Sequence, residues 1–312
     1  NGGMYAVSVA IASRRYMTRR KREALWGYVF ASSWILNFML FSLFPFVFAI
    51  YLSFCYFQGL GTIRWIGLYN YQKMFRDPMV AHSLWVTFKY TLMSVPINMV
   101  SGVAMAVLLN QKVRGLGVWR TIYYLPAVLP QIAALMLWGW IFSHHGILNW
   151  FLSLFGFKAV DWLTNEYTVL PAFIIMNLWY VGSGVLIYLA AMQNVPTEFY
   201  EAAQIDGANA WQRFWHITIP QISPILFMQL IFNIIGSLQT FSQVIVMIGN
   251  NPNPGALFFS FYVYQQFFLS NQYGYAAALS WLLFAIIAVI TALTFKWSQA
   301  WVYYEGMRTK GR

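Results

Sequence analysis

Uncharged polar side chains recur at helical spacing inside a long apolar stretch in the last third of the chain. Four of them, separated by four, four and three residues, fall on one face of an α-helix: Gln229, Asn233, Ser237 and Thr240. Gln243 lies slightly off that face, and Asn177 and Tyr180 stand in another apolar stretch. Amide and hydroxyl groups beside aromatic rings suit a ligand such as a sugar, which presents hydroxyls at its edges and C–H faces for stacking. The alternative is hydrogen bonding between membrane helices, which uses the same side chains.

A second concentration of polar residues lies in the segment 194–218. Three of the chain's eight acidic residues fall here: Glu198, Glu201 and Asp206. Asn194 or Thr197 is predicted to cap a helix start, where acidic side chains suit the positive end of the helix dipole. Gly207 is free to adopt positive φ and is predicted to end that helix before a second one over about 208–216.

The hairpin predicted over 194–218 is half apolar and half polar. Ala202 and Ala203 would let another surface approach closely, which favours docking on a partner. An amphipathic connector that lies on lipid headgroups would show the same composition. The residues alone leave both interpretations open.

No constellation typical of catalysis or metal binding stands out in the sequence. The single cysteine, Cys55, excludes a disulfide framework and a cysteine-based metal site. Neither zinc-ligand spacing nor a P-loop or dinucleotide-binding glycine pattern occurs. His144 and His145 are adjacent, so they point in different directions on a helix and are expected at the membrane interface rather than around a metal. We therefore predict that this chain holds no catalytic residue, metal or cofactor of its own.

The elements that must position these residues follow from the composition. Of 312 residues, 60% are hydrophobic, 20% aromatic and only 9% charged, whereas a soluble domain carries about 25% charged residues. This excludes a soluble enzyme and, because the apolar content is high, intrinsic disorder. The net charge of +11 would suit nucleic-acid binding in a soluble protein. Here the basic residues flank apolar runs and indicate membrane orientation instead, so no nucleic-acid partner is expected.

Stretches free of Asp, Glu, Lys and Arg locate the predicted membrane spans, since a charged side chain at the bilayer centre costs about 2.5–3.5 kcal/mol on insertion scales. A span needs about 20 residues, and the longest such stretch is broken by the turn-forming run 249–255. The sequence predicts an all-α, polytopic fold with six spans, at about 27–56, 83–110, 119–142, 167–193, 219–247 and 276–299.

Basic residues set the predicted orientation of these spans. With the N-terminus inside, 14 of the 19 Lys and Arg residues fall in inner segments, which places both termini in the cytoplasm. The apolar run after the N-terminal basic cluster is too long for a signal peptide, so the segment is expected to be a retained anchor. The chain divides into a basic cytoplasmic segment (1–24), a membrane domain (25–300) that includes the 194–218 hairpin, and a cytoplasmic tail (301–312).

The hairpin also carries a family signature. The matching residues, with their spacing intact, are Glu201-Ala202-Ala203, Asp206-Gly207-Ala208, Phe214, Ile217, Ile219-Pro220 and Pro224. They resemble the EAA motif of ABC importer permeases, in which this hairpin is the coupling helix that inserts into a groove on a cytoplasmic ATPase. The resemblance implies the type I ABC importer permease fold. It also implies ATPase contacts at eight positions: Glu198, Glu201, Ala202, Ala203, Asp206, Gly207, Ala208 and Phe214.

Further motifs extend the resemblance over about residues 25–300 and are similar to those of maltose-type carbohydrate importers. They include Trp65-Ile66-Gly67-Leu68, Asn70-Tyr71, Asp77-Pro78, Thr87, Trp119-Arg120-Thr121, Leu125-Pro126 and Asn251-Pro252. The resemblance implies a permease of the bacterial inner membrane that moves a carbohydrate, such as an oligosaccharide or an acidic one like alginate. It implies that sugar passes near Asn177, Tyr180 and the polar stripe of 229–243. The implied partners are a second, non-identical permease, a solute-binding protein, a cytoplasmic ATPase dimer that binds Mg-ATP, and membrane lipid.

Two other classes remain open from the residues alone. An ion-coupled secondary transporter would need coupling sites, yet charged residues are nearly absent from the spans and inverted repeats are not evident. An integral-membrane glycan-processing enzyme would need convergent acid and base groups. Only Asp161, Glu166 and the histidine pair are available on the outer side, scattered among aromatic residues.

Overall fold

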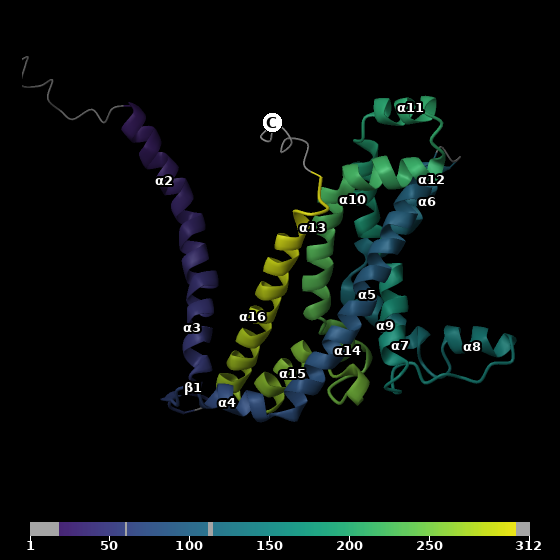
Figure 1. The fold of residues 1–312 in the computed structure, drawn as a ribbon. Helices are drawn as coiled ribbons and strands as arrows, with labels where there is room; N and C mark the ends of the chain where they lie inside the picture. The colour runs from purple at the N-terminus through teal and green to yellow at the C-terminus, as the bar shows by residue number, and fades with distance from the viewer. Residues whose placement is uncertain (1–18, 60, 112–114, 304–312) are drawn as a thin grey trace, which may run out of the picture.

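The computed structural model describes residues 19–59, 61–111 and 115–303, and this part of the chain is mostly helical (Figure 1). The predicted all-α membrane fold is thereby confirmed. Most of the predicted N-terminal segment, most of the predicted C-terminal tail, and Lys112 and Arg114 lie outside the described residues.

The N-terminal half begins with a helix that contains one π-helical turn: α2 (Arg19–Phe38), η1 (Met39–Leu43) and α3 (Phe44–Ser53). Two short antiparallel strands follow, β1 (Cys55–Tyr56) and β2 (Arg64–Trp65), with Cys55 opposite Trp65. The next elements are α4 (Tyr69–Arg76), α5 (Pro78–Asn110), α6 (Leu116–Val128), α7 (Gln131–Ile141) and α8 (Ile147–Leu154).

The C-terminal half starts with α9 (Val169–Trp179) and α10 (Gly182–Gln193). The hairpin consists of α11 (Thr197–Ile205) and α12 (Ala210–Arg213), and a π-helical turn, η2 (Phe214–Thr218), joins α12 to α13 (Ile219–Leu238). The last elements are α14 (Ser242–Met247), η3 (Pro254–Ala256), α15 (Phe259–Tyr264), η4 (Gln265–Leu269) and α16 (Tyr273–Ser298).

Four helical stretches are long and apolar enough to cross a membrane unbroken: Glu23–Ser53, Pro78–Asn110, Ala210–Leu238 and Tyr273–Ser298. Two bent pairs, α6 with α7 and α9 with α10, raise the number to six if each pair is one span. The six predicted spans therefore all have helical counterparts, but three of them are not the continuous helices that the sequence predicted.

Each of these three breaks occurs at an identifiable residue or turn. The predicted span 119–142 turns by 98° at Leu129, which is extended because Pro130 follows it. The predicted span 167–193 bends by 48° between α9 and α10. There Gly182 lies so close to the backbone of Tyr123 that a side chain would clash. The predicted span 219–247 ends at Leu238, and α14 starts a new helix after an irregular turn.

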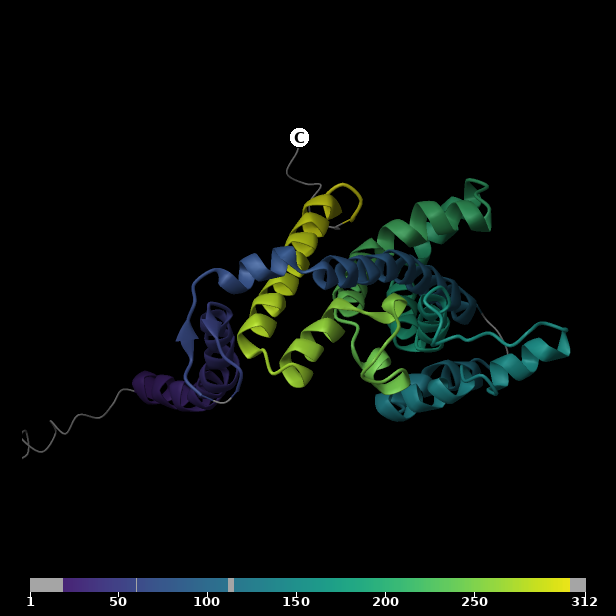
Figure 2. The same ribbon diagram turned by 90° about the horizontal axis from the view of Figure 1, so that it is seen from below.

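Helix α5 is the centre of the bundle and packs against α9, α10, α13 and α15. Helix α16 joins this core to the N-terminal helix through α3, where Phe46 contacts the rings of Trp281 and Phe284. Every described side chain of α2 is exposed, and this helix stands apart from the rest of the bundle in two perpendicular views (Figures 1 and 2).

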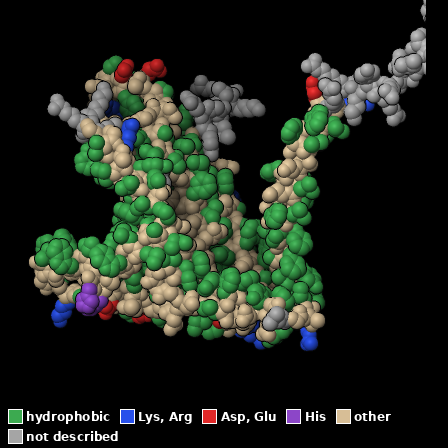
Figure 3. Space-filling view, turned by 180° about the vertical axis from the view of Figure 1, so that it is seen from behind, with side chains coloured by type: hydrophobic (Ala, Val, Ile, Leu, Met, Phe, Trp, Pro, Cys, Tyr) green, Lys and Arg blue, Asp and Glu red, His purple; other side chains and the backbone are tan. Residues whose placement is uncertain are grey.

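The molecule has two ends, which we name after an element at each. The hairpin end carries α11 and α12, and the α4 end carries β1, β2, α4, α8 and α15 (Figure 1). Charged side chains gather at these ends, whereas hydrophobic side chains cover most of the height between them (Figure 3). This distribution is the one expected of a bundle that spans a bilayer.

Candidate functional site

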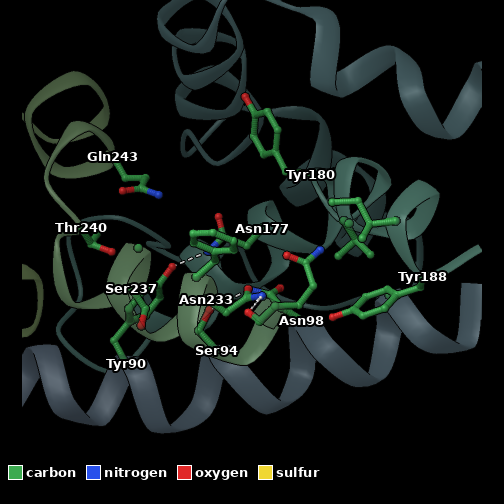
Figure 4. Close-up of a pocket in the computed structure, with 17 residues that line it drawn as sticks. Tyr90, Ser94, Asn98, Asn177, Tyr180, Tyr188, Asn233, Ser237, Thr240 and Gln243 are labelled. Atoms are coloured by element: carbon green, nitrogen blue, oxygen red, sulfur yellow. Dashed lines mark hydrogen bonds between the residues drawn. The ribbon is translucent and has the colours of Figure 1, made fainter. Parts of the chain in front are cut away.

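A cavity of about 380 Å³ opens in the middle of the bundle, between α5, the α9–α10 pair and the α13–α14 pair. All seven residues proposed from the sequence for a substrate path line it: Asn177, Tyr180, Gln229, Asn233, Ser237, Thr240 and Gln243. The structure thus brings together two groups of residues that are about fifty positions apart in the chain. Figure 4 shows Asn177, Asn233 and Ser237 close together, with Gln243 and Tyr180 farther out.

Helix α5 supplies a third wall that the sequence analysis missed. Tyr90, Ser94 and Asn98 follow one another at intervals of four residues and face the cavity (Figure 4). Asn177 donates a hydrogen bond to the Tyr90 hydroxyl, and Asn98 donates one of 3.1 Å to Ser94 Oγ. The four-residue spacing is the same signal that identified the stripe on α13, so it was available in the sequence.

One acceptor on this wall is left open. The Asn98 Oδ1 atom is buried and has no hydrogen-bond partner among the described residues. A buried acceptor without a partner is costly unless water or a ligand satisfies it. Asn98 therefore marks a point at which a hydroxyl donor would be stabilised.

Breaks in two helices lie beside the cavity. Tyr180 and Val181 connect α9 to α10, and Thr240 lies in the turn between α13 and α14. Irregular backbone at membrane depth is tolerated where it lines a polar cavity, and such breaks are typical of transport sites. Gly102 permits the close packing of α5 on α10, because a Cβ at this position would lie 2.8 Å from the Tyr188 ring.

Every side chain that lines the cavity is uncharged. Amides and hydroxyls are combined with the rings of Tyr90, Tyr180, Tyr188 and Phe232. Such a lining can donate to and accept from hydroxyl groups and can stack on apolar C–H faces. The described lining contains no Asp, Glu, His, Lys or Cys side chain, the usual partners in acid–base chemistry.

The 194–218 hairpin is formed as predicted, with differences at its helix starts. Gly207 has a φ of +77° and ends α11, where its N–H bonds the Gln204 carbonyl and the Ala208 N–H bonds the Ala203 carbonyl. The predicted caps at Asn194 and Thr197 are wrong. Pro196 precedes α11, and no side chain caps the helix start there. The proline ring fixes φ at the turn that leads into the helix.

The second helix of the hairpin begins two residues later than predicted, at Ala210. Asn209 and Gln212 form a reciprocal capping box there, with distances of 2.8 and 2.9 Å. The Asn-x-x-Gln spacing carried this signal in the sequence and was overlooked. The hydroxyls of Tyr200 and Thr218, 2.9 Å apart, join α11 to the base of α13.

The eight residues proposed for ATPase contacts lie on this projecting hairpin. Glu198, Glu201, Ala202, Asp206 and Gly207 are exposed, whereas Ala203, Ala208 and Phe214 are half-buried. Large apolar side chains are exposed beside them: Ile205 (86%), Trp211 (69%) and Trp215 (48%). Exposed apolar side chains mixed with acidic ones are typical of a surface that another protein or a lipid interface covers.

A dense polar cluster, which we call the Asp77 cluster, lies at the α4 end. It comprises Lys73, Asp77, Tyr262, Gln272 and Tyr275. Tyr262 and Tyr275, both buried, donate hydrogen bonds to Asp77 Oδ2, the second at 2.7 Å. Lys73 donates to Gln272 Oε1 and lies 4.0 Å from the centre of the Tyr275 ring. The cluster therefore ties α4 and α5 to α15 and α16.

Burial and the contacts within this cluster shift the pKa values of Asp77 and Lys73. Burial by itself would raise the pKa of Asp77, but the hydrogen bonds from Tyr262, Tyr275 and the Met79 N–H, with the charge of Lys73, hold this pKa below its ordinary value. Burial lowers the pKa of Lys73, and the negative charge of Asp77 offsets part of that effect. Asp77 is therefore ionised at neutral pH.

Other residues of the sequence motifs also serve long-range contacts at the α4 end. Asn70 donates to the carbonyls of Ser53 and Cys55, each at 2.9 Å. Thr87 accepts from the Phe259 N–H at 2.9 Å, at the start of α15. Asn70 therefore ties α4 to the chain around the end of α3, and Thr87 ties α5 to α15.

His144 contacts an acidic residue and the neighbouring histidine. Its Nδ1 atom lies 3.0 Å from Asp161 Oδ1, and the ring of His145 meets that of His144 edge to face. No group of three or more His, Cys, Asp or Glu side chains within the described ranges converges on a metal-sized site.

The comparisons with known proteins agree with this architecture. The family model described as the binding-protein-dependent transport system inner membrane component matches residues 98–302. The chain is 36% identical over 290 residues to the probable ABC transporter permease protein YesP of Bacillus subtilis, covering 91% of this chain and 94% of the relative. It is 32% identical to the arabinooligosaccharides transport system permease protein AraP of the same organism, covering 87% and 88%.

A solved structure supports the same fold. A chain of a bacterial ABC transporter involved in the import of the acidic polysaccharide alginate superposes with a TM-score of 0.79, at 24% identity, covering 90% of this chain and 96% of that one. The central cavity, the projecting hairpin and these similarities lead to one conclusion. The chain belongs to the family of binding-protein-dependent transport system inner-membrane components, the permeases of ABC transporters.

Proposed function

We propose that this chain is the permease subunit of an ATP-driven importer, and that a neutral oligosaccharide passes through its central cavity. The uncharged lining of that cavity carries the proposal, because it pairs amide and hydroxyl groups with aromatic rings. Named relatives support the substrate class: AraP is a permease for arabinooligosaccharides, and LacF of Rhizobium radiobacter, 31% identical, is a permease for lactose.

An acidic oligosaccharide is the second candidate substrate. The similarity to the chain of the alginate transporter is a similarity of fold. None of the described residues that this chain contributes to the cavity is a cation. An acidic ligand would need its counter-charge from the second permease, so the neutral class is favoured.

We propose that ATP hydrolysis by a partner ATPase acts on the hairpin end of the bundle. The 194–218 hairpin projects from the bundle with acidic and apolar side chains exposed, which suits insertion into a groove of an ATPase dimer that binds Mg-ATP. The sequence prediction assigns most Lys and Arg residues to the same side of the membrane as the 194–218 hairpin, so the hairpin end is assigned to the cytoplasm and the α4 end to the outside. The α4 end would then face the solute-binding protein.

Uptake into proteoliposomes that contain the complete complex tests the proposal. We expect ATP-dependent uptake of labelled arabino-oligosaccharides and none of oligouronides of equal length. Thr240→Val should raise the KM for uptake about 2- to 10-fold, the equivalent of one hydrogen bond. The matched change Thr294→Val lies in α16, away from the cavity lining, and should leave the KM unchanged.

Two results would contradict this assignment. Uptake of oligouronides alone would show that the substrate class is wrong. Uptake that follows an ion gradient without ATP would show that the transport class is wrong.

A further inference from the structure

Helix α8 lies at the periphery of the α4 end (Figure 1). It runs across the direction of the spans and projects sideways from the bundle beyond α7 (Figure 1). Its side chains contribute little to the central cavity or to the Asp77 cluster. The question is what covers its exposed surface.

One face of α8 is a continuous apolar stripe. The residues at relative positions 0, 3, 4, 7 and 8 are bulky and at least half exposed: Ile147, Trp150, Phe151, Leu154 and Phe155. This spacing places all five on the same side of the helix. An exposed apolar stripe of this width marks a surface that is covered in the assembled protein.

The opposite face of α8 is fastened by one buried side chain. Asn149, 4% exposed, donates from Nδ2 to the Val160 carbonyl at 2.9 Å and to the carbonyls of Ser143 and His144. Its Oδ1 atom accepts from the Val160 N–H at 3.0 Å and from Trp162 Nε1 at 3.1 Å. Because these bonds fix the rotation of α8 about its own axis, the apolar stripe cannot turn inward.

Helix α8 and the loops before and after it form an arm at the side of the bundle. Polar side chains lie on the side of this arm that points away from the hairpin end. Figure 3 shows hydrophobic side chains over the part of the arm that faces the hairpin end, with His, Lys or Arg and acidic side chains along its far edge. The exposed ionisable residues of the loops before and after α8 include His144, His145, Lys158, Asp161 and Glu166. The apolar side of this arm therefore faces the part of the molecule whose surface is mostly hydrophobic.

We propose that α8 is an interfacial helix, and that its apolar stripe is inserted at the boundary between headgroups and hydrocarbon of the phospholipid leaflet at the α4 end. Trp and Phe side chains favour this depth, and Lys158 lies where it can meet a phosphate. Helix α7, which contacts α8, also has exposed apolar side chains, Met136 and Trp140. A soluble binding protein would approach from the far side, which is polar.

Spin-label accessibility in the complete complex, reconstituted in nanodiscs of phosphatidylcholine and phosphatidylglycerol, tests this inference. Cysteine replaces Phe151 on the stripe or, as a matched control two residues away, Ser153 on the polar side. Cys55 is fully buried and stays in place, with the unsubstituted chain as the labelling blank. We expect the label at residue 151 to collide several-fold more with oxygen than with a water-soluble nickel chelate, and the label at 153 to show the reverse.

Two outcomes would overturn the inference. High accessibility of both labels to the nickel chelate would place α8 in water. Protection of the label at 151 from both reagents would show that protein, such as the second permease, covers the stripe. Leu154→Cys on the same stripe repeats the test if labelling at 151 disturbs folding. None of these readouts depends on which sugar is transported.

Discussion

The two ends of the molecule are built on different principles. At the α4 end, side chains join elements that are far apart in sequence, as Asp77 does with Tyr262 and Tyr275. Within the 194–218 hairpin, the side-chain hydrogen bonds span a few residues, as in the Asn209–Gln212 capping box, or 18 residues between Tyr200 and Thr218, and large apolar side chains are left exposed.

This contrast separates stability from function. Buried, charge-assisted hydrogen bonds between distant helices hold a packing arrangement. The hairpin has a capping box and a glycine turn of its own, and much of its surface is exposed, so that surface is free for a partner. We therefore expect substitutions at the α4 end to lower stability and substitutions in the hairpin to uncouple transport.

The largest effect is expected from charge reversal in the hairpin. Glu201 is exposed, and Glu201→Lys should reduce ATP-driven uptake and substrate-stimulated ATP hydrolysis more than 10-fold, because it places a cation where the partner surface meets an acid. Amounts of folded complex should not change. The matched reversal Glu166→Lys, also exposed but at the α4 end, should leave coupling intact. Equal loss in both variants would refute the comparison.

A second test uses two glycines with the same backbone conformation. Gly207 in the hairpin and Gly156 after α8 both have a φ of +77°. Valine at either position should cost about 1–2 kcal/mol of local strain. Gly207→Val should lower uptake several-fold because the hairpin turn changes shape, whereas Gly156→Val should not. Uptake by both variants, measured in the same proteoliposomes, decides this.

At the α4 end, the expected effect is on stability. Asp77→Ala removes a helix cap and leaves two buried tyrosine hydroxyls without their acceptor, which should destabilise the chain by about 3 kcal/mol. A thermal unfolding series in detergent should show a fall of several degrees. Asp161→Ala, which loses one exposed bond to His144, is the control and should stay within about one degree. A normal midpoint for Asp77→Ala would show that the cluster does not hold the helices.

The smallest effect is a pH dependence with a defined sign. The pKa of Asp77 is lower in the folded chain than in the unfolded chain. Its contribution to stability is therefore complete above the unfolded pKa, near 4, and is lost as pH falls through the folded value. The unfolding midpoint should fall less steeply between pH 4 and 3 in Asp77→Asn than in the unsubstituted chain. Identical pH profiles would contradict the assignment.

The sequence predicted what depends on local composition. Charge-free stretches located all the spans, and the stripe from Gln229 to Gln243 does line one cavity. The breaks at Leu129 and Thr240 escaped prediction, because hydropathy does not register a helix that ends inside an apolar stretch. Gly182 identifies its break only once Tyr123 is known to lie against it.

Contacts between residues far apart in the sequence could not be predicted either. The partners of Asp77 are 185 and 198 residues away, and that of His144 is 17 residues away, so no periodicity connects them. Asn98 showed the same spacing as the residues on α13, but its role became visible only when α5 was seen to pack against α10 and α13.

The most direct test of the account is a photo-cross-link from the tip of the hairpin. Ile205, 86% exposed, is replaced by a benzophenone amino acid in the complete complex, with the same probe at Ser153 of α8 as a control. If the hairpin contacts the ATPase, the probe at 205 should attach to an ATPase subunit and the probe at 153 should not. Attachment of the probe at 205 to lipid alone would show that the hairpin is an interfacial connector and would contradict the proposed coupling.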